Sequence, residues 1–260
     1  MKKAKKIFLG AVIALVVLIV AGILIAGAFL GPIVKKGVEA IGPRITKVSV
    51  KVDEVHLSLL TGSASVKGLV IGNPEGYQMP QAISAGMVAV GVNPLSVMSD
   101  KIVLRSVHLE SPEITFEGAL TGNNLSQILD NVNSAARNDA QTGGAVSTNT
   151  TVQAKSSKKY ELDDLLITGA KVHVRLTDLG KEMTLSLPPI HLADLGKNKE
   201  GITAADLSRS VLDAIVTATV KAVANSGFEK NAEQLLIKST GKNAEAVSNI
   251  TRGLGNLLGK

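Results

Sequence analysis

Residues 7–30, IFLGAVIALVVLIVAGILIAGAFL, form an apolar run without a charged residue, and this run constrains the chain more than any other feature. As a helix it would measure about 36 Å, enough to cross the roughly 30 Å hydrocarbon core of a bilayer with some tilt. Four lysines precede the run within residues 1–6, and only Lys35 and Lys36 follow closely. By the positive-inside rule, we predict a basic cytoplasmic tail over 1–6, a transmembrane signal anchor over 7–30 and export of the remaining chain.

A cleaved signal peptide is the competing interpretation, because a lysine-rich start, an apolar stretch and the small-residue triplet at 26–28 are its three parts. The apolar part of such a peptide spans about 7–15 residues, which is shorter than this run. The uncleaved anchor is therefore favoured. No cysteine occurs in the chain, which excludes lipoprotein anchoring, disulfides and thiolate chemistry.

The net charge of +6 does not indicate a nucleic-acid partner. The chain has 28 Lys and Arg against 22 Asp and Glu, and setting aside the four N-terminal lysines leaves 24 basic residues, so the exported part is nearly neutral. The whole chain has no Trp, two Tyr and four Phe, so it also lacks the aromatic platforms on which single-stranded nucleic acids stack. We therefore predict no nucleic-acid binding.

A helical connector is predicted over 31–43, ending where Gly42 offers a C-cap and Pro43 prevents continuation. Beyond it, alternation of apolar and polar residues predicts about eight or nine strands. A phase slip at Asp53–Glu54 indicates a β-bulge. The strands have one apolar and one polar face, which is typical of an antiparallel sheet. They are expected over 48–52, 55–59, 64–71, 83–92, 101–109, 113–118, 160–167, 170–177 and 183–192.

Two segments of the chain repeat each other, each as a strand, a two-residue corner and a second strand. Stacked copies of such a unit indicate a sheet that grows by addition, although chance similarity between two amphipathic hairpins is the alternative. The matched apolar positions are Leu104, Val107, Leu109, Ile114 and Phe116 in the first copy, and Leu162, Leu165, Ile167, Val172 and Val174 in the second.

Helical spacing of Leu125, Ile128, Leu129 and Val132 predicts a helix over 123–137. Residues 138–158 are rich in Gly, Ser, Thr, Asn and Gln, which favours a flexible insertion; a boundary between two domains is the alternative. A C-terminal helical segment is predicted over 203–260, with Thr203 as its N-cap and further helices over 228–239 and 242–258. The last helix is expected on the apolar face of the sheet, on a partner or on the outer leaflet of the membrane.

Motifs of catalysis are missing from the sequence. It contains no G-x-S-x-G elbow, no phosphate-binding glycine loop and no HExxH helix. The histidines at 56, 108, 173 and 191 each stand between aliphatic residues in predicted strands, which places them on the solvated polar face; a metal site would require them to converge. Acidic pairs at 53–54 and 163–164 fit ordinary turns. We predict a protein that is not an enzyme and has no cofactor or metal.

The cadence of strands and turns resembles a known family. Its most specific pieces are residues 68–77 (GLVIGNPEGY) and 111–114 (SPEI). Over about 1–137 and again over 158–192, the chain is similar to the N-terminal module of AsmA-like proteins of Gram-negative envelopes. The resemblance implies a β-rich domain over 44–202, anchored in the inner membrane and lying in the periplasm. It also implies a half-barrel or taco-shaped groove whose apolar inner face holds lipid, with a role in phospholipid transport or outer-envelope biogenesis.

The inferred groove is short. Eight or nine strands spaced about 4.8 Å apart give roughly 40 Å, too little to bridge an envelope alone. The alternative is a ligand-free scaffold for envelope assembly partners, in which the helices after Thr203 cover the apolar face. If lipid acyl chains bind, the expected lining is Val48, Val50, Val52, Leu57, Leu59, Leu109, Ile114, Phe116, Ile167, Val172, Val174, Leu185 and Leu187.

Overall fold

The computed structural model describes residues 30–120, 122–141, 158–175, 182–197 and 200–227. The basic tail, the predicted anchor apart from residue 30, and the predicted helices over 228–239 and 242–258 lie outside the described residues. Among the helices that are described, none combines the length and the apolar character that a membrane crossing requires.

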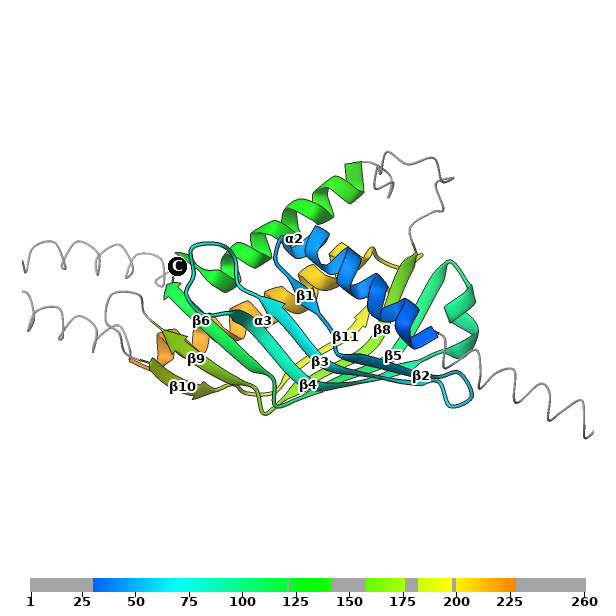
Figure 1. The fold of residues 1–260 in the computed structure, drawn as a ribbon, viewed down its shortest axis with the longest axis horizontal. Helices are drawn as coiled ribbons and strands as arrows, with labels where there is room; N and C mark the ends of the chain where they lie inside the picture. Colours follow the sequence, from blue (N-terminus) through cyan, green and yellow to red (C-terminus); the bar gives the residue numbers. More distant parts are fainter. Residues whose placement is uncertain (1–29, 121, 142–157, 176–181, 198–199, 228–260) are drawn as a thin grey trace, which may run out of the picture.

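The described residues form an open β-sheet with helices against it (Figure 1). A helix over 30–46 precedes the sheet, η1 (Pro94–Met98) is a short 3-10 helix, and α2 (Asn124–Gln141) and α3 (Ala204–Asn225) are long helices. The strands are β1 (Val50–Lys51), β2 (Glu54–Ser58), β3 (Ser63–Gly72), β4 (Gln81–Val92), β5 (Lys101–Glu110), β6 (Glu113–Ala119), β7 (Gly122–Asn123), β8 (Lys159–Thr168), β9 (Lys171–Arg175), β10 (Glu182–Ser186) and β11 (Ile190–Leu195).

Apart from the short β7, these strands combine into six passes of the chain across the sheet. β1 and β2 both pair with β3, which pairs with β4; β5 and β6 both pair with β4, and β8 and β9 pair with β5 and β6. The last pass consists of β10 and β11, which pair with β9 and β8. Six passes spaced about 4.8 Å apart extend over about 24 Å, so the sheet is narrower than the sequence predicts.

The sheet is mixed, and the prediction of a purely antiparallel sheet is wrong at two places. β5 pairs with β8 and β6 pairs with β9 in parallel, while the other pairs are antiparallel. A parallel neighbour requires a crossover that brings the chain back to the end where the first strand began. Residues between β6 and β8, which include α2, make that connection.

A line at which the apolar alternation changes phase crosses all six passes of the sheet, and we call this line the crease. Continuing the register across each break puts six residues on one line: Asp53, Gly68, Gly86, Ser111, Gly169 and Pro188. Gly68, Ser111 and Gly169 have φ values of 61°, 51° and 64°, in the left-handed region. The apolar alternation shifts by one residue on every pass at this line, so the apolar residues on both sides of it lie on the same face of the sheet.

The crease explains two local errors of the sequence prediction. At Asp53 the chain does not form a one-residue bulge, because Lys51 pairs with Val70 and Glu54 with Lys67, which are equal steps on both strands. Residues 183–192 are not one strand, since two prolines at 188–189 interrupt the ladder.

The helix over 30–46 covers the edge of the sheet along β1 and β2. The Glu39 carboxylate accepts the Val52 N–H (3.1 Å), and Lys35 Nζ donates to the Asp53 carbonyl (2.8 Å), so the helix satisfies backbone groups that an edge strand leaves free. The prediction that the helix ends at Gly42–Pro43 is wrong. It continues to residue 46 and ends before Lys47, which takes the left-handed conformation (φ 59°).

Both long helices pack on the apolar face of the sheet. On α2, Leu125, Ile128 and Val132 are almost completely buried, as their helical spacing predicts. The helix extends to Gln141, four residues beyond its predicted end. The N-cap of α3 is Thr203, whose hydroxyl accepts the Asp206 N–H (3.0 Å), as predicted.

A buried polar network lies where the loop between β3 and β4 meets β6 and α2. The Glu117 carboxylate, which is fully buried, accepts the N–H groups of Gln78 (2.8 Å) and Met79 (2.9 Å). Asn124 accepts the Glu117 N–H through Oδ1 (2.9 Å) and donates through Nδ2 to Asn73 Oδ1 (2.7 Å). These bonds give the loop after residue 72 a fixed place on the sheet.

Candidate functional site

The inner face of the sheet, which α2 and α3 contact, consists of rows of aliphatic side chains. The strand registers define three complete rows with one residue from each pass. They are Val50, Ile71, Ile83, Ile114, Val172 and Leu185 on one side of the crease, and Val55, Val66, Val88, Leu109, Ile167 and Ile190 followed by Leu57, Ala64, Val90, Val107, Leu165 and Leu192 on the other.

Burial along these rows is uneven. In the third row Leu165 is only 3% exposed, whereas Val107, Val90 and Leu57 of the same row are half-buried. Leu165 belongs to the main core cluster, together with residues of α2 and α3. On the other side of Leu165, Leu192 of β11 is half-buried as well, so the helices cover the row most closely at Leu165 and leave part of the apolar surface of β2 to β5 accessible.

Nine of the thirteen residues predicted to line a groove lie within described strands. The other four, Val48, Val52, Leu59 and Leu187, lie one or two residues from the end of a strand. Nine are buried: Val48, Val50, Val52, Ile114, Phe116, Ile167, Val172, Val174 and Leu187. Four are half-buried: Leu57, Leu59, Leu109 and Leu185. The structure thus brings most of the set together in the core.

Sequence reasoning missed several half-buried members of the inner face. Ala64, Val66, Val90 and Val107 belong to alternating segments that the sequence analysis identified as strands, yet they were not among the predicted lining residues. No signal in the sequence separates them from the buried positions, because the same alternation runs through both, and Val66 even pairs with the buried Val55 and Val88.

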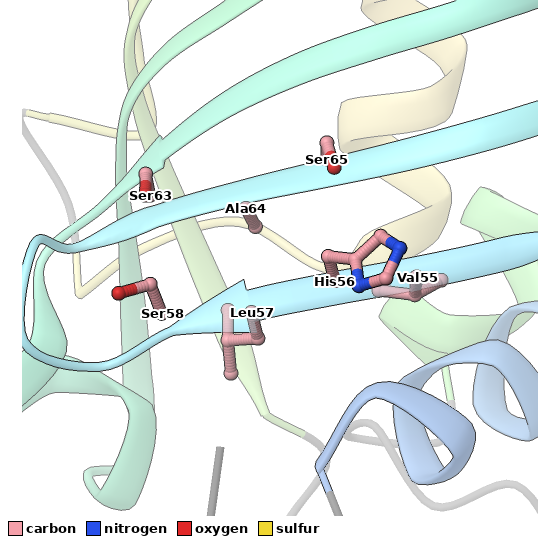
Figure 2. Close-up of a pocket in the computed structure, with 7 residues that line it drawn as sticks. All are labelled: Val55, His56, Leu57, Ser58, Ser63, Ala64 and Ser65. Atoms are coloured by element: carbon pink, nitrogen blue, oxygen red, sulfur yellow. The ribbon is translucent and has the colours of Figure 1, made fainter. Parts of the chain in front are cut away.

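A shallow hollow of about 310 Å³ lies at the β2–β3 hairpin, at the accessible side of these rows. Figure 2 shows the residues around it: Leu57 and Ala64 extend from one side of the hairpin, whereas His56 and Ser65 extend from the other. The hairpin therefore presents an apolar and a polar surface at the edge of the sheet.

The opposite, outer face carries all four histidines, as predicted. His56 contacts Glu54 (2.9 Å) and His173 contacts Glu113, each on the same or the adjacent strand. Asp164 lies between His191 (2.6 Å) and His108 (3.4 Å). Hydrogen bonding from His191, with a smaller contribution from His108, lowers the pKa of the Asp164 carboxyl. Within the described residues, no three His, Asp or Glu side chains form a group suited to a metal ion.

These features define a class of protein: an open, creased β-sheet with a continuous aliphatic inner face that helices cover only in part. Comparison with protein families identifies the chain more closely. The sequence model of the AsmA family matches residues 1–194, about three quarters of the chain, and the protein belongs to this family. Comparison with curated proteins gave no significant match. The matched residues include nearly all of the sheet, while α3 lies beyond them.

The two motifs that carried the resemblance have structural roles. Gly68 and Ser111 lie on the crease, and both have positive φ. A Cβ at Gly68 would lie 1.9 Å from the Asp53 carboxylate, so the close approach of two strands requires glycine there. Asn73 joins the buried network around Glu117 through Asn124 and also donates to the Met79 carbonyl (2.7 Å).

Proposed function

We propose that this protein is a non-enzymatic, lipid-binding member of the AsmA family, which holds phospholipid acyl chains against the accessible part of its inner face. The observation that carries the proposal is the run of adjacent half-buried aliphatic residues in one row, Val107, Val90 and Leu57, beside the buried Leu165. Half-buried aliphatic side chains that lie next to one another across strands form an apolar surface whose exposure to water costs free energy. An acyl chain is an apolar ligand that can cover this surface.

The place of action follows from the N-terminal sequence. We propose that residues 7–30 anchor the chain in the inner membrane, with a cytoplasmic N-terminus and the sheet in the periplasm. Family membership supports an envelope-related role, and phospholipid transport or outer-envelope biogenesis is the finer assignment that we propose. With about six passes, one molecule offers room for part of a lipid and would have to pass it to a partner.

A second candidate function is a ligand-free scaffold for envelope assembly partners. The observation in its favour is the fully buried stripe of α2, since Leu125, Ile128 and Val132 already occupy part of the inner face. The two functions differ in what contacts the uncovered strands: lipid in the first, and only water or protein in the second.

The experiment that separates them uses neighbouring residues of β4 that face opposite ways. A photo-crosslinking amino acid would replace Val90 on the inner face or Ala89 on the outer face of the full chain, in cells grown with ³²P-phosphate. We expect crosslinked, radiolabelled phospholipid from position 90 and several-fold less from position 89. Equal labelling at both, or protein adducts alone at position 90, would favour the scaffold.

A further inference from the structure

Exposed apolar side chains gather at one end of the sheet. Seven large apolar residues are strongly exposed among those described, and five lie at this end: Ile33, Val34, Leu60, Leu95 and Met98. Isolated exposed apolar residues are ordinary on protein surfaces, but their concentration at one end requires an explanation. We call these five residues the apolar rim.

Contacts place the β2–β3 turn against η1, and the start of the helix over 30–46 lies against β2 at the same end of the molecule. Leu60 lies in the β2–β3 turn, and Leu95 and Met98 lie in η1. A Cβ at Gly62 would lie 3.1 Å from the Pro94 ring, so the turn touches η1. A Cβ at Gly31 would lie 2.2 Å from the Val55 carbonyl oxygen, which places the beginning of the helix over 30–46 against β2. Figure 1 shows the start of this helix and the β2–β3 hairpin at the same end of the molecule.

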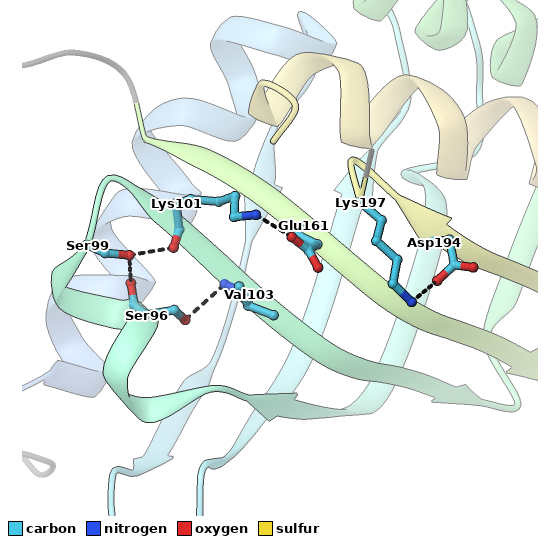
Figure 3. A network of polar contacts seen from close by, with 7 residues as sticks. All are labelled: Ser96, Ser99, Lys101, Val103, Glu161, Asp194 and Lys197. Carbon is cyan, nitrogen blue, oxygen red and sulfur yellow. Dashed lines mark hydrogen bonds and ion pairs between the residues drawn. The ribbon is translucent and has the colours of Figure 1, made fainter. Parts of the chain in front are cut away.

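The segment that presents Leu95 and Met98 is held firmly. Leu95 is 88% exposed and Met98 94%, yet Ser96 between them is buried. Ser96 Oγ donates to the Asn93 carbonyl (2.7 Å). It also accepts the Val103 N–H (2.9 Å), and Ser99 Oγ lies 2.6 Å from the Lys101 carbonyl (Figure 3). Such fixed presentation of two apolar side chains lowers the entropic cost of binding a surface.

The proposed membrane anchor, residues 7–30, indicates which surface this end of the sheet contacts. The helix over 30–46 begins beside β2 at this end of the sheet, and in the sequence it follows the apolar residues 7–30. If that run spans the bilayer as we propose, the rim lies at the membrane surface from which the chain emerges. Lys158 Nζ donates to the Val97 carbonyl (3.1 Å) and the Ser99 carbonyl (2.8 Å), which places a positive charge beside η1. A positive charge next to the exposed Leu95 and Met98 favours contact with anionic headgroups.

We propose that the apolar rim inserts into the outer leaflet of the anchoring membrane and holds the sheet with its uncovered rows open toward the lipid. This contact rests on the proposed anchoring of residues 7–30, but not on lipid binding by the inner face. A small group of exposed apolar side chains with a lysine beside it is suited to the headgroup boundary of a bilayer rather than to its centre.

The test uses the full chain, in which every introduced cysteine is unique because the sequence has none. Leu95→Cys, Met98→Cys and, at an exposed loop position outside the rim, Glu75→Cys would each carry an environment-sensitive fluorophore. The proteins would be reconstituted into vesicles of phosphatidylethanolamine and phosphatidylglycerol that contain nitroxide-labelled lipid. We expect quenching at positions 95 and 98 at least threefold stronger than at position 75.

A double change in the rim provides the second arm. With the fluorophore on Leu60→Cys, the substitutions Leu95→Asp and Met98→Asp should reduce lipid quenching severalfold, whereas Glu75→Gln should not change it. Quenching at 95 and 98 no stronger than at 75, loss of the full chain from the vesicles on alkaline extraction, or crosslinks between two copies through Met98→Cys would each overturn the proposal. Crosslinking at Val90 remains a separate measurement, so failure of the rim and failure of the lipid-binding face are distinguishable.

Discussion

Ile114 of β6 lies directly beside Val172 of β9, as its partner in a parallel pair. The same pairing holds between each remaining member of the first repeat and its match in the second, for example Leu104 with Leu162 and Phe116 with Val174. The two copies of the strand–corner–strand unit are therefore neighbours in the sheet, in register residue by residue. This confirms the expectation that stacked copies extend one sheet.

Removing one side chain of the central pair should be costly. We expect Ile114→Ala, at a position 1% exposed, to lower the free energy of unfolding by about 2–5 kcal/mol, because it leaves a cavity between the sheet and its covering helices. Val172→Ala should couple with it, so the double variant should lose less than the sum of the two single losses. Chemical denaturation in detergent, followed by circular dichroism, measures both. The exposed Leu95→Ala should change stability by less than about 0.5 kcal/mol.

Alanine substitutions at two glycines on the crease should have different effects on stability. Gly169 has a φ of 64°, and a Cβ there would lie 2.9 Å from Ser111 Oγ, so Gly169→Ala should destabilise the protein by about 1–2 kcal/mol. Gly86 lies on the same line with open space around its Cα, and Gly86→Ala should be neutral or slightly stabilising. Urea denaturation of the two variants checks this, and equal losses at both positions would contradict a specific backbone role for Gly169.

Replacing the buried Glu117 carboxylate with the corresponding amide should destabilise the folded protein. Glu117→Gln keeps the shape but turns one acceptor into a donor that faces an N–H of Gln78 or Met79. We expect a loss of about 1.5–3 kcal/mol in unfolding free energy. The loop between β3 and β4 should also become more open to limited proteolysis. The exposed Glu75→Gln, in the same loop, is the matched control and should leave both measurements unchanged.

Much of the sheet could be predicted because its strands have one apolar face. Alternation identified the strand segments, and the capping pattern at Thr203 identified the start of α3. The spacing of Leu125, Ile128 and Val132 marked the buried side of α2. These features depend on neighbours along the chain, which a sequence displays directly.

Relations between distant segments could not be predicted in the same way. Parallel pairing of β5 with β8 depends on where the crossover returns the chain, and the crease becomes visible only when six registers are aligned. Accessibility of the inner face depends on which strands α2 and α3 reach. For this reason a buried residue such as Val172 and a half-buried one such as Val107 had the same sequence signature.

Stability should depend on pH through Asp164. Its pKa is lowered in the folded protein, mainly by the hydrogen bond from His191, so its contribution is present above the ordinary aspartate pKa of about 4 and is lost as the pH falls through the lower, folded-state value. We expect Asp164→Asn to melt below the wild type at pH 5, and the difference between the two melting temperatures to shrink as the pH is lowered below about 4. Thermal denaturation across this range measures the difference. The control is Asp213→Asn, at an exposed position. If its melting temperature depended on pH in the same way, the effect would not belong to the histidine cluster around Asp164.

Substitutions in the third inner row can separate the contribution of a residue to core packing from its contribution to lipid binding. Val107→Asn and Leu165→Asn place the same polar group on adjacent passes, because these residues lie in one row of the sheet. Leu165 is buried, so its variant should lose about 3 kcal/mol or more and fold poorly. Val107 is half-buried, so its variant should lose about 1 kcal/mol and remain folded. Lipid crosslinking from position 90, its partner on β4, should nevertheless fall severalfold. A folded Val107→Asn protein that crosslinks lipid at the wild-type level would show that acyl chains do not lie on this row.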